Sequence, residues 1–323
     1  MVTIKDIARE SGVSYSTVSV VIGNRTTKLP LSEKTRIKVL NAATRLGYHR
    51  NALATQIQTG KTGFVSFISP EVNHEYIFKI FTGASVEAMS HGYTVKLHEL
   101  PSGENVLDSE NIRKLYNSIF ELRPEGIIFV RDIPDFEYMN KIAKQLGIAS
   151  ACANSVKSFG LDVTIYPNSI CGEIKAVEYL HSLGHRNFCF ISDEKTRNYA
   201  LFRQNGFIQA VEKYKIPLKK EWIFEEDYRN NNKIDLFLGK IMKAPEKPTV
   251  ACCASDYIAL QVILSASRLG IDIPGELSVM GYGDIEFTKF LTPSISTVSE
   301  HFDVMGRTAF RRLLAHIKDK SLA

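Results

Sequence analysis

The chain has 323 residues, of which 44% are hydrophobic and 23% are charged, and this composition is that of a globular protein long enough for two or three compact units. No stretch approaches the roughly 20 consecutive apolar residues that a membrane-spanning helix requires, and the N-terminus lacks the pattern of a signal peptide. The five cysteines form no C-x-x-C pair and no zinc-binding spacing with histidine. We therefore expect a cytoplasmic protein with no membrane contact and no structural metal.

Charge is unevenly distributed along the chain. Residues 1–61 contain ten Lys and Arg against three acids, a net charge of +7, whereas residues 62–323 carry a net charge of −2. A basic stretch is often only a solvated face. The difference between the two parts, however, is typical of a nucleic-acid-binding head on a nearly neutral body.

The first residues have the pattern of two short helices joined by a glycine turn. Apolar residues within 4–10 recur at steps of three and four, Gly12 interrupts them, and Ser14 is a suitable N-cap for a helix over about residues 15–22. The inward-facing residues of this second helix are Val18, Val21 and Ile22. Ala8, Gly12 and Val18, at spacings of four and six, match the helix-turn-helix pattern and predict DNA binding.

The outward face of the second helix would enter the major groove. Tyr15 and Ser16 can hydrogen-bond base edges or phosphates, and the hydroxyls of Ser14 and Ser19 suit phosphate oxygens. Val20 is suited to a thymine methyl group, and the alternative is that it is an isolated surface valine.

A third helix is predicted to follow, with Ser32 as its N-cap and Gly47 after its end. Ile37, Leu40 and Ala43 recur along it at steps of three. Three helices of this size would complete a small core within the first 48 or so residues.

Segments 4–19, 32–36 and 46–51 strongly resemble the headpiece of the lactose-repressor (LacI/GalR) family of bacterial transcription regulators, and the resemblance continues along nearly the whole chain. It implies that Thr17 belongs to the DNA-binding set and that residues 51–59 form a hinge helix, with Asn51 and Ala54 in the family pattern. The minor-groove wedge falls on Ile57, where leucine is usual, and Ile57 could alternatively serve only in hinge packing.

Beyond residue 62, short apolar runs alternate with helix-length segments, which predicts parallel sheets covered by helices. The expected strands are residues 64–68, 94–97, 126–130, 148–153, 188–191, 250–254 and 278–280, and the expected helices include residues 76–91, 168–183, 199–215 and 256–269. The fold class is thus an all-α helix-turn-helix headpiece with a hinge helix, followed by a two-lobed α/β domain that resembles periplasmic binding proteins. We place the headpiece and hinge at residues 1–60 and the effector-binding and dimerisation domain at 61–323, with lobe one at about 62–165 and 299–320 and lobe two at about 166–298.

The resemblance places effector contacts on Tyr76, Arg197, Arg203 and Tyr228. Arginines bind anionic or polyhydroxylated groups at two points, and tyrosines stack on rings. Both arginines could instead be surface residues or structural ion-pair partners. Because Gly283 stands where the family usually has a carboxylate, we expect a phosphorylated or carboxylated effector more than a plain sugar, and a site that has lost effector binding is the alternative.

These observations predict a homodimeric repressor that binds a near-palindromic operator under the control of a small-molecule effector, without catalytic residues, cofactor or metal. One alternative is an enzyme, and catalytic activity that persists after deletion of residues 1–60 would favour it. The other alternative is the solute-binding protein of a transporter, and a lack of affinity for DNA would favour it.

Overall fold

The structure is a computed structural model that describes residues 2–23, 31–49, 56, 60–70, 72–100, 108–155, 160–194 and 198–319. Its contacts divide the chain into two units: Met1–Gly63 with Arg123–Glu125, and Phe64–Leu122 with Gly126–Ala323. The boundary that we drew at residues 60 and 61 remains a prediction.

The first unit contains the three expected helices, α1 (Ile4–Ser11), α2 (Tyr15–Gly23) and α3 (Glu33–Arg45). Their buried side chains form one small core, made of Ile7, Val18, Val21, Val39, Ala42 and Ala43. Ser32 caps α3 as predicted, because its Oγ accepts a hydrogen bond from the amide of Thr35 at 3.2 Å.

The buried face of α3 differs from the predicted one. Val39, Ala42 and Ala43 are buried, whereas Ile37 and Leu40 are 50% and 43% exposed. A step of three residues follows the helix surface only approximately, so the same segment offers two candidate apolar faces. Packing against α1 and α2 selects the face that carries Val39.

Lobe one is built on a parallel sheet of five strands in the order β2-β1-β3-β4-β5. Its strands are β1 (Phe64–Ser69), β2 (Thr94–Glu99), β3 (Gly126–Val130), β4 (Ala149–Ala153) and β5 (Val163–Ile165). Its helices are α5 (Glu75–Ser90), α6 (Ser109–Glu121), α7 (Phe136–Gln145) and the last helix of the chain, α12 (Phe302–Lys318).

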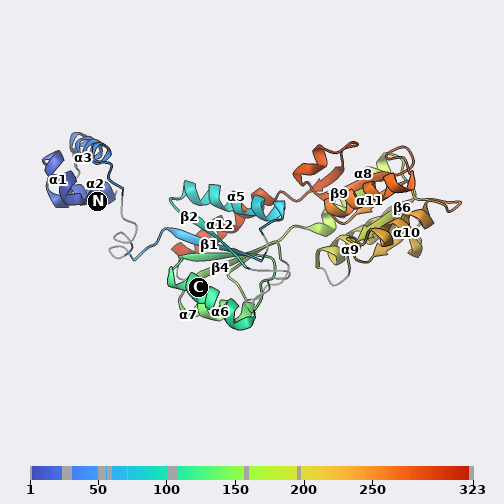
Figure 1. Cartoon of the computed structure of the whole chain (residues 1–323), viewed down its shortest axis with the longest axis horizontal. Helices are drawn as coiled ribbons and strands as arrows, with labels where there is room; N and C mark the ends of the chain where they lie inside the picture. Colours follow the sequence, from blue (N-terminus) through green and yellow to red (C-terminus); the bar gives the residue numbers. More distant parts are fainter. Residues whose placement is uncertain are drawn as a thin grey trace. The chain divides into compact units, whose positions relative to one another are not determined.

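Helices cover both faces of this sheet, with α5 and α12 on one face and α6 and α7 on the other (Figure 1). Successive residues of β1 therefore enter different cores. Phe67 packs in the core shared with α5 and α12, and Ile68 packs in the core shared with α6 and α7. Burial on both faces explains the continuous apolar runs in the sequence.

Lobe two repeats this architecture with a parallel sheet in the order β10-β9-β8-β6-β7. Its strands are β6 (Phe188–Ser192), β7 (Ile223–Glu225), β8 (Val250–Cys253), β9 (Ser278–Gly283) and β10 (Ser296–Ser299). Its helices are α8 (Ser169–Ser182), α9 (Asn198–Lys213), α10 (Asn231–Ile241) and α11 (Asp256–Leu269), with the short 3-10 helices η2 (Lys220–Trp222) and η3 (Glu286–Lys289). The predicted strands are thus all present, and the structure adds three that were not predicted, β5, β7 and β10.

Candidate DNA-binding helix and candidate effector site

The turn between α1 and α2 has the geometry that the glycine pattern predicts. Gly12 adopts a φ of +60°, and the amide of Val13 donates to the carbonyl oxygen of Ala8 at 3.2 Å, which ends α1. Such a left-handed conformation is readily adopted by glycine and costly for other residues. Ser14 then caps α2, because its Oγ accepts a hydrogen bond from the amide of Thr17 at 3.2 Å.

Packing in the small core fixes which face of α2 points outward. Ile7 of α1 and Val18 of α2 are fully buried against each other's helices, and Val21 is 6% exposed. Because these side chains occupy one side of α2, the residues on the opposite side are left to face solvent.

The outward side of α2 is rich in hydroxyl groups and carries no charge. Tyr15 is 55% exposed, Ser14 and Ser16 are exposed, and Thr17 and Ser19 are half-buried. The unpaired amides and positive dipole at a helix N-terminus suit phosphate oxygens, so this end of α2 can contact a duplex without a basic residue of its own.

Val20 is half-buried, like Thr17 and Ser19, and its contact with a thymine methyl group remains a prediction. It lies next to the core face formed by Val18 and Val21, whose packing covers part of it. The predicted contacts of Asn51, Ala54 and Ile57 lie outside the described residues.

Basic side chains on the neighbouring helices supply the charge that α2 lacks. Lys5, Lys34 and Lys38 are exposed on α1 and α3. The charges of two arginines are partly neutralised by acids of the same unit, because Arg9 lies 3.9 Å from Asp6 and Arg45 lies 3.2 Å from Glu10.

The three predicted effector residues that the structure describes lie beyond the carboxyl ends of strands in the two lobes, where parallel sheets bind ligands. Tyr76 follows β1, Tyr228 follows β7, and Arg203 projects from α9, which follows β6; Arg197 lies outside the described residues. The hydroxyl of Tyr76 accepts a hydrogen bond from Arg131 Nη1 at 3.2 Å, so this side chain is held in place before any ligand binds.

Aromatic rings connect these positions. His74 stacks on Tyr76 with 5.6 Å between ring centroids and meets the edge of Tyr257, in lobe two, at 6.0 Å. Burial raises the pKa of Tyr257, and the charges of Glu75, Tyr228 and Tyr76 raise it further. Ring contacts through His74 therefore connect Tyr76 of lobe one to Tyr257 of lobe two.

Arg203 is the centre of a buried ionic cluster. Its Nη2 lies 2.7 Å from Glu300 Oε2, and the two side chains are only 8% and 3% exposed. It also donates to the carbonyl oxygen of Ala254 and lies 4.0 Å from the centroid of the Tyr282 ring. The structure thus shows Arg203 as an ion-pair partner, one of the alternatives that the sequence left open.

A second carboxyl group, Glu173 of α8, faces the same guanidinium. Burial raises the pKa of Glu173 to about 8, Arg203 opposes this rise, and the charge of Glu300 adds to it. One arginine cannot fully neutralise two buried carboxylates, so Glu173 holds a proton near neutral pH.

Neither carboxyl group was predicted from the sequence. Glu173 stands three and four residues before Ala176 and Val177, on the buried side of α8, and this helical spacing is the signal that would have revealed it. Glu300 follows β10, a strand that was not predicted, and therefore had no such signal.

Both the helical headpiece and the α/β domain match known protein families. Residues 3–51 match the family described as bacterial regulatory proteins, lacI family, and residues 177–323 match the periplasmic binding protein-like domain. The chain thus combines a helix-turn-helix domain of the lacI family with a periplasmic binding protein-like domain.

Relatives of this regulator cover nearly its whole length. The "HTH-type transcriptional repressor PurR" of Proteus mirabilis is 29% identical over 323 residues, which are 99% of this chain and 92% of that protein. The protein of the same name from Yersinia pestis (strain Pestoides F) is 28% identical over 326 residues, with the same coverage.

Solved structures show the same fold. The lac repressor dimer bound to operator and the anti-inducer ONPF superposes with a TM-score of 0.78 at 21% identity, over 98% of this chain and 93% of that one. The complex of the transcriptional regulator CelR with cellobiose gives a TM-score of 0.66 at 21% identity, over 98% and 94%. The predicted helix-turn-helix headpiece and two-lobed α/β domain are therefore confirmed, and the predicted hinge helix lies outside the described residues. The lacI-family domain and the repressor relatives make the chain a transcription regulator rather than an enzyme.

Within the described ranges, no helix is long and apolar enough to cross a membrane. Nor do those ranges contain a group of three or more His, Cys, Asp or Glu side chains that could hold a metal ion.

Proposed function

We propose that this regulator is a cytoplasmic transcriptional repressor that binds a near-palindromic operator as a homodimer, with α2 in the major groove. The observation that carries the proposal is the turn at Gly12, which leaves the hydroxyl-rich side of α2 exposed while Val18 is buried. Side chains on such a helix reach base edges, whereas lysines around it bind phosphates regardless of sequence. Two copies related by a two-fold axis would read two half-sites.

A Tyr15→Ala variant tests base reading directly. We expect a loss of about tenfold or more in affinity for an operator selected from the organism's own DNA fragments, because a specific base contact contributes about 1–3 kcal/mol. Affinity for unrelated DNA should change little, since it depends on phosphate contacts. Gel-shift titrations on both DNAs measure the difference.

Tyr179→Ala is a matched control. Tyr179 is 54% exposed on α8, almost the same as the 55% of Tyr15, but it belongs to the other unit. It should leave both affinities unchanged. Equal losses on operator and unrelated DNA in Tyr15→Ala would contradict base reading.

We further propose that a small-molecule effector binds between the lobes and contacts Tyr76 and Tyr228, with Arg203 and Arg197 beside them. A sugar has more support than a sugar phosphate or another anionic metabolite, because an anion would have to displace Glu300 from Arg203 at 2.7 Å. Thermal-shift measurements with matched neutral and phosphorylated sugars would discriminate between the classes. A Tyr228→Ala variant should lose the shift that the true effector produces, and a phosphorylated sugar that stabilises the chain more than its neutral counterpart would contradict this preference.

A further inference from the structure

The turn that follows β9, residues 283–286, is held in an unusual backbone conformation. Gly283 adopts a φ of +134° and Asp284 a φ of +56°, both in the left-handed half of conformational space. A Cβ on Gly283 would lie 3.1 Å from Asp256 Oδ2, so a side chain here would press on a buried carboxylate as well as strain the backbone.

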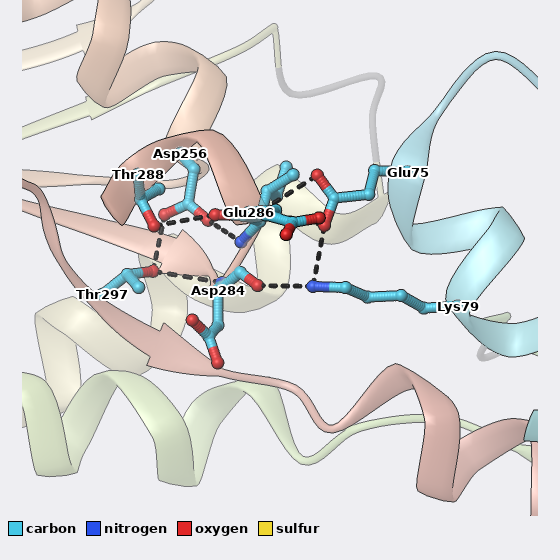
Figure 2. A network of polar contacts seen from close by, with 8 residues as sticks. Glu75, Lys79, Asp256, Asp284, Glu286, Thr288 and Thr297 are labelled. Atoms are coloured by element: carbon cyan, nitrogen blue, oxygen red, sulfur yellow. Dashed lines mark hydrogen bonds and ion pairs between the residues drawn. The ribbon is translucent and has the colours of Figure 1, made fainter. Parts of the chain in front are cut away.

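Lobe two fixes this turn from one side through the fully buried Asp256. Asp256 Oδ2 accepts a hydrogen bond from the amide of Ile285 at 2.9 Å, and Oδ1 accepts one from Thr297 Oγ1 at 2.5 Å (Figure 2). Thr297 Oγ1 in turn accepts from the amide of Asp284 at 3.3 Å. These bonds fix the backbone of the turn so that the amide of Glu286 and the carbonyl oxygen of Asp284 face α5 of lobe one.

Two side chains of α5, in lobe one, hydrogen-bond the same turn (Figure 2). The amide of Glu286 donates to both carboxylate oxygens of Glu75, at 2.8 and 2.9 Å. Lys79 Nζ donates to the carbonyl oxygen of Asp284 at 2.9 Å and pairs with Glu75 at 2.8 Å. Residues more than 200 positions apart are thus joined by charge-assisted hydrogen bonds, which are stronger than neutral ones.

The contact is accessible enough to open. The side chains of Lys79 and Glu75 are 34% and 27% exposed, so water can replace their partners. Lys79, Gly283 and Asp284 also border a hollow of about 200 Å³ that the crossover from β10 to α12 completes. The lobe-two groups that Glu75 and Lys79 bind are backbone atoms, so the contact depends on the shape of the turn, which Gly283 permits, and uses no side chain of Asp284 or Glu286.

We infer that Glu75, Lys79 and residues 283–286 form an interlobe latch, which stabilises one arrangement of the lobes and thereby sets operator affinity. The regulatory half of this inference rests on the proposed function. A ligand that favours another arrangement must break the latch, and it can shift the equilibrium only by its difference in affinity for the two arrangements. Glu75 and Lys79 are positioning residues, since they act through the lobes and contact no DNA in this role.

Glu75→Gln and Lys79→Met in the full-length chain test the latch. The direct readout is amide hydrogen exchange at Glu286, whose N–H is hydrogen-bonded to Glu75. We expect exchange in a peptide covering 284–288 to become about tenfold faster in both variants, equivalent to about 1.4 kcal/mol. The operator dissociation constant, measured without effector, should change at least threefold, while affinity for unrelated DNA stays constant.

Glu87→Gln is the matched control. Glu87 lies on the same helix and forms an equivalent ion pair, with Arg311 at 3.0 Å, but α5 and α12 both belong to lobe one. It should leave exchange at Glu286 and operator affinity unchanged.

If amide exchange at Glu286 were unchanged in both variants, the latch itself would be overturned. If exchange were faster but operator affinity were unchanged, the regulatory role of the latch would be overturned. If the wild-type chain bound no DNA, the proposed function would fail, and the exchange data would still decide whether the lobes are latched.

Discussion

Replacing Glu173 by Gln should remove part of the pH dependence of the free energy of unfolding. Burial raises the pKa of Glu173 from its ordinary value of 4.5 to about 8 in the folded chain. A carboxyl group with a raised pKa binds its proton more tightly when folded, so folding takes up a proton between these two pH values. The free energy of unfolding must therefore fall as pH rises through this window.

The size of the effect follows from the shift. The free energy of unfolding of the wild type falls by up to about 1.4 kcal/mol for each pH unit, and by about 4 kcal/mol in total between pH 4.5 and pH 8. Glutamine has the shape of protonated glutamate and does not titrate. The Glu173→Gln variant should thus match the wild type in stability near pH 5 and exceed it by several kcal/mol near pH 8.

Urea unfolding at a series of pH values measures this difference. Trp222 is the single tryptophan of the chain and lies buried in the core of lobe two, so its fluorescence reports on the unit that contains Glu173. Glu178→Gln, on the exposed side of the same helix, is the control and should leave the wild-type slope in place. A Glu173→Gln variant that loses stability at every pH would show that the carboxylate is ionised and paired with Arg203, which would refute the reasoning.

Three further outcomes are expected. Arg203→Met should lower the free energy of unfolding by about 3–5 kcal/mol at pH 7, because it leaves Glu300 buried without its cation; urea unfolding followed at Trp222 would show this, and a loss below 1 kcal/mol would contradict it. Gly12→Ala should speed amide exchange across α1 and α2 roughly fivefold, the equivalent of about 1 kcal/mol, since alanine is strained at a φ of +60°; unchanged exchange would mean that the turn relaxes freely. A thiol reagent should titrate one cysteine in the native chain, the exposed Cys171, because the other four are buried and burial raises the pKa of Cys152 and Cys189 to about 12; a second fast-reacting thiol would contradict the packing.

The headpiece could be predicted because its contacts are local. Gly12, Ser14 and Val18 act on residues within a few positions of themselves, and their spacing alone specifies the turn and the buried side of α2. The failure on α3 has the same origin. Val39 and Leu40 are both apolar, and only the position of α1 and α2 decides which of them is buried.

The strands that escaped prediction share one physical property. β5, β7 and β10 all lie at sheet edges and have only three or four residues each. An edge strand is covered less completely than a central one and needs no continuous apolar run. β10 illustrates this, since none of its four residues is fully buried.

The family resemblance named candidate effector residues, but it did not reveal the side chains that surround Arg203. The resemblance pointed to Arg203, whereas its partner Glu300 lies 97 positions away, beyond a strand with no clear signal. No local pattern can pair two such residues, because the pairing is created by the order of strands in the sheet.

The same strand order places the Arg203 cluster and the interlobe latch beside each other. Tyr282, whose ring lies under Arg203, directly precedes Gly283 at the start of the latch turn. Glu300, which pairs with Arg203, lies between Ser299 and His301, and both border the hollow next to Lys79. Two residues that contact Arg203, Tyr282 and Glu300, are therefore direct chain neighbours of residues that form or border the latch. A ligand that moved Arg203 would act on these same peptide segments. Effector binding and lobe arrangement can be coupled through these two strand ends, β9 and β10, without a longer path through the core.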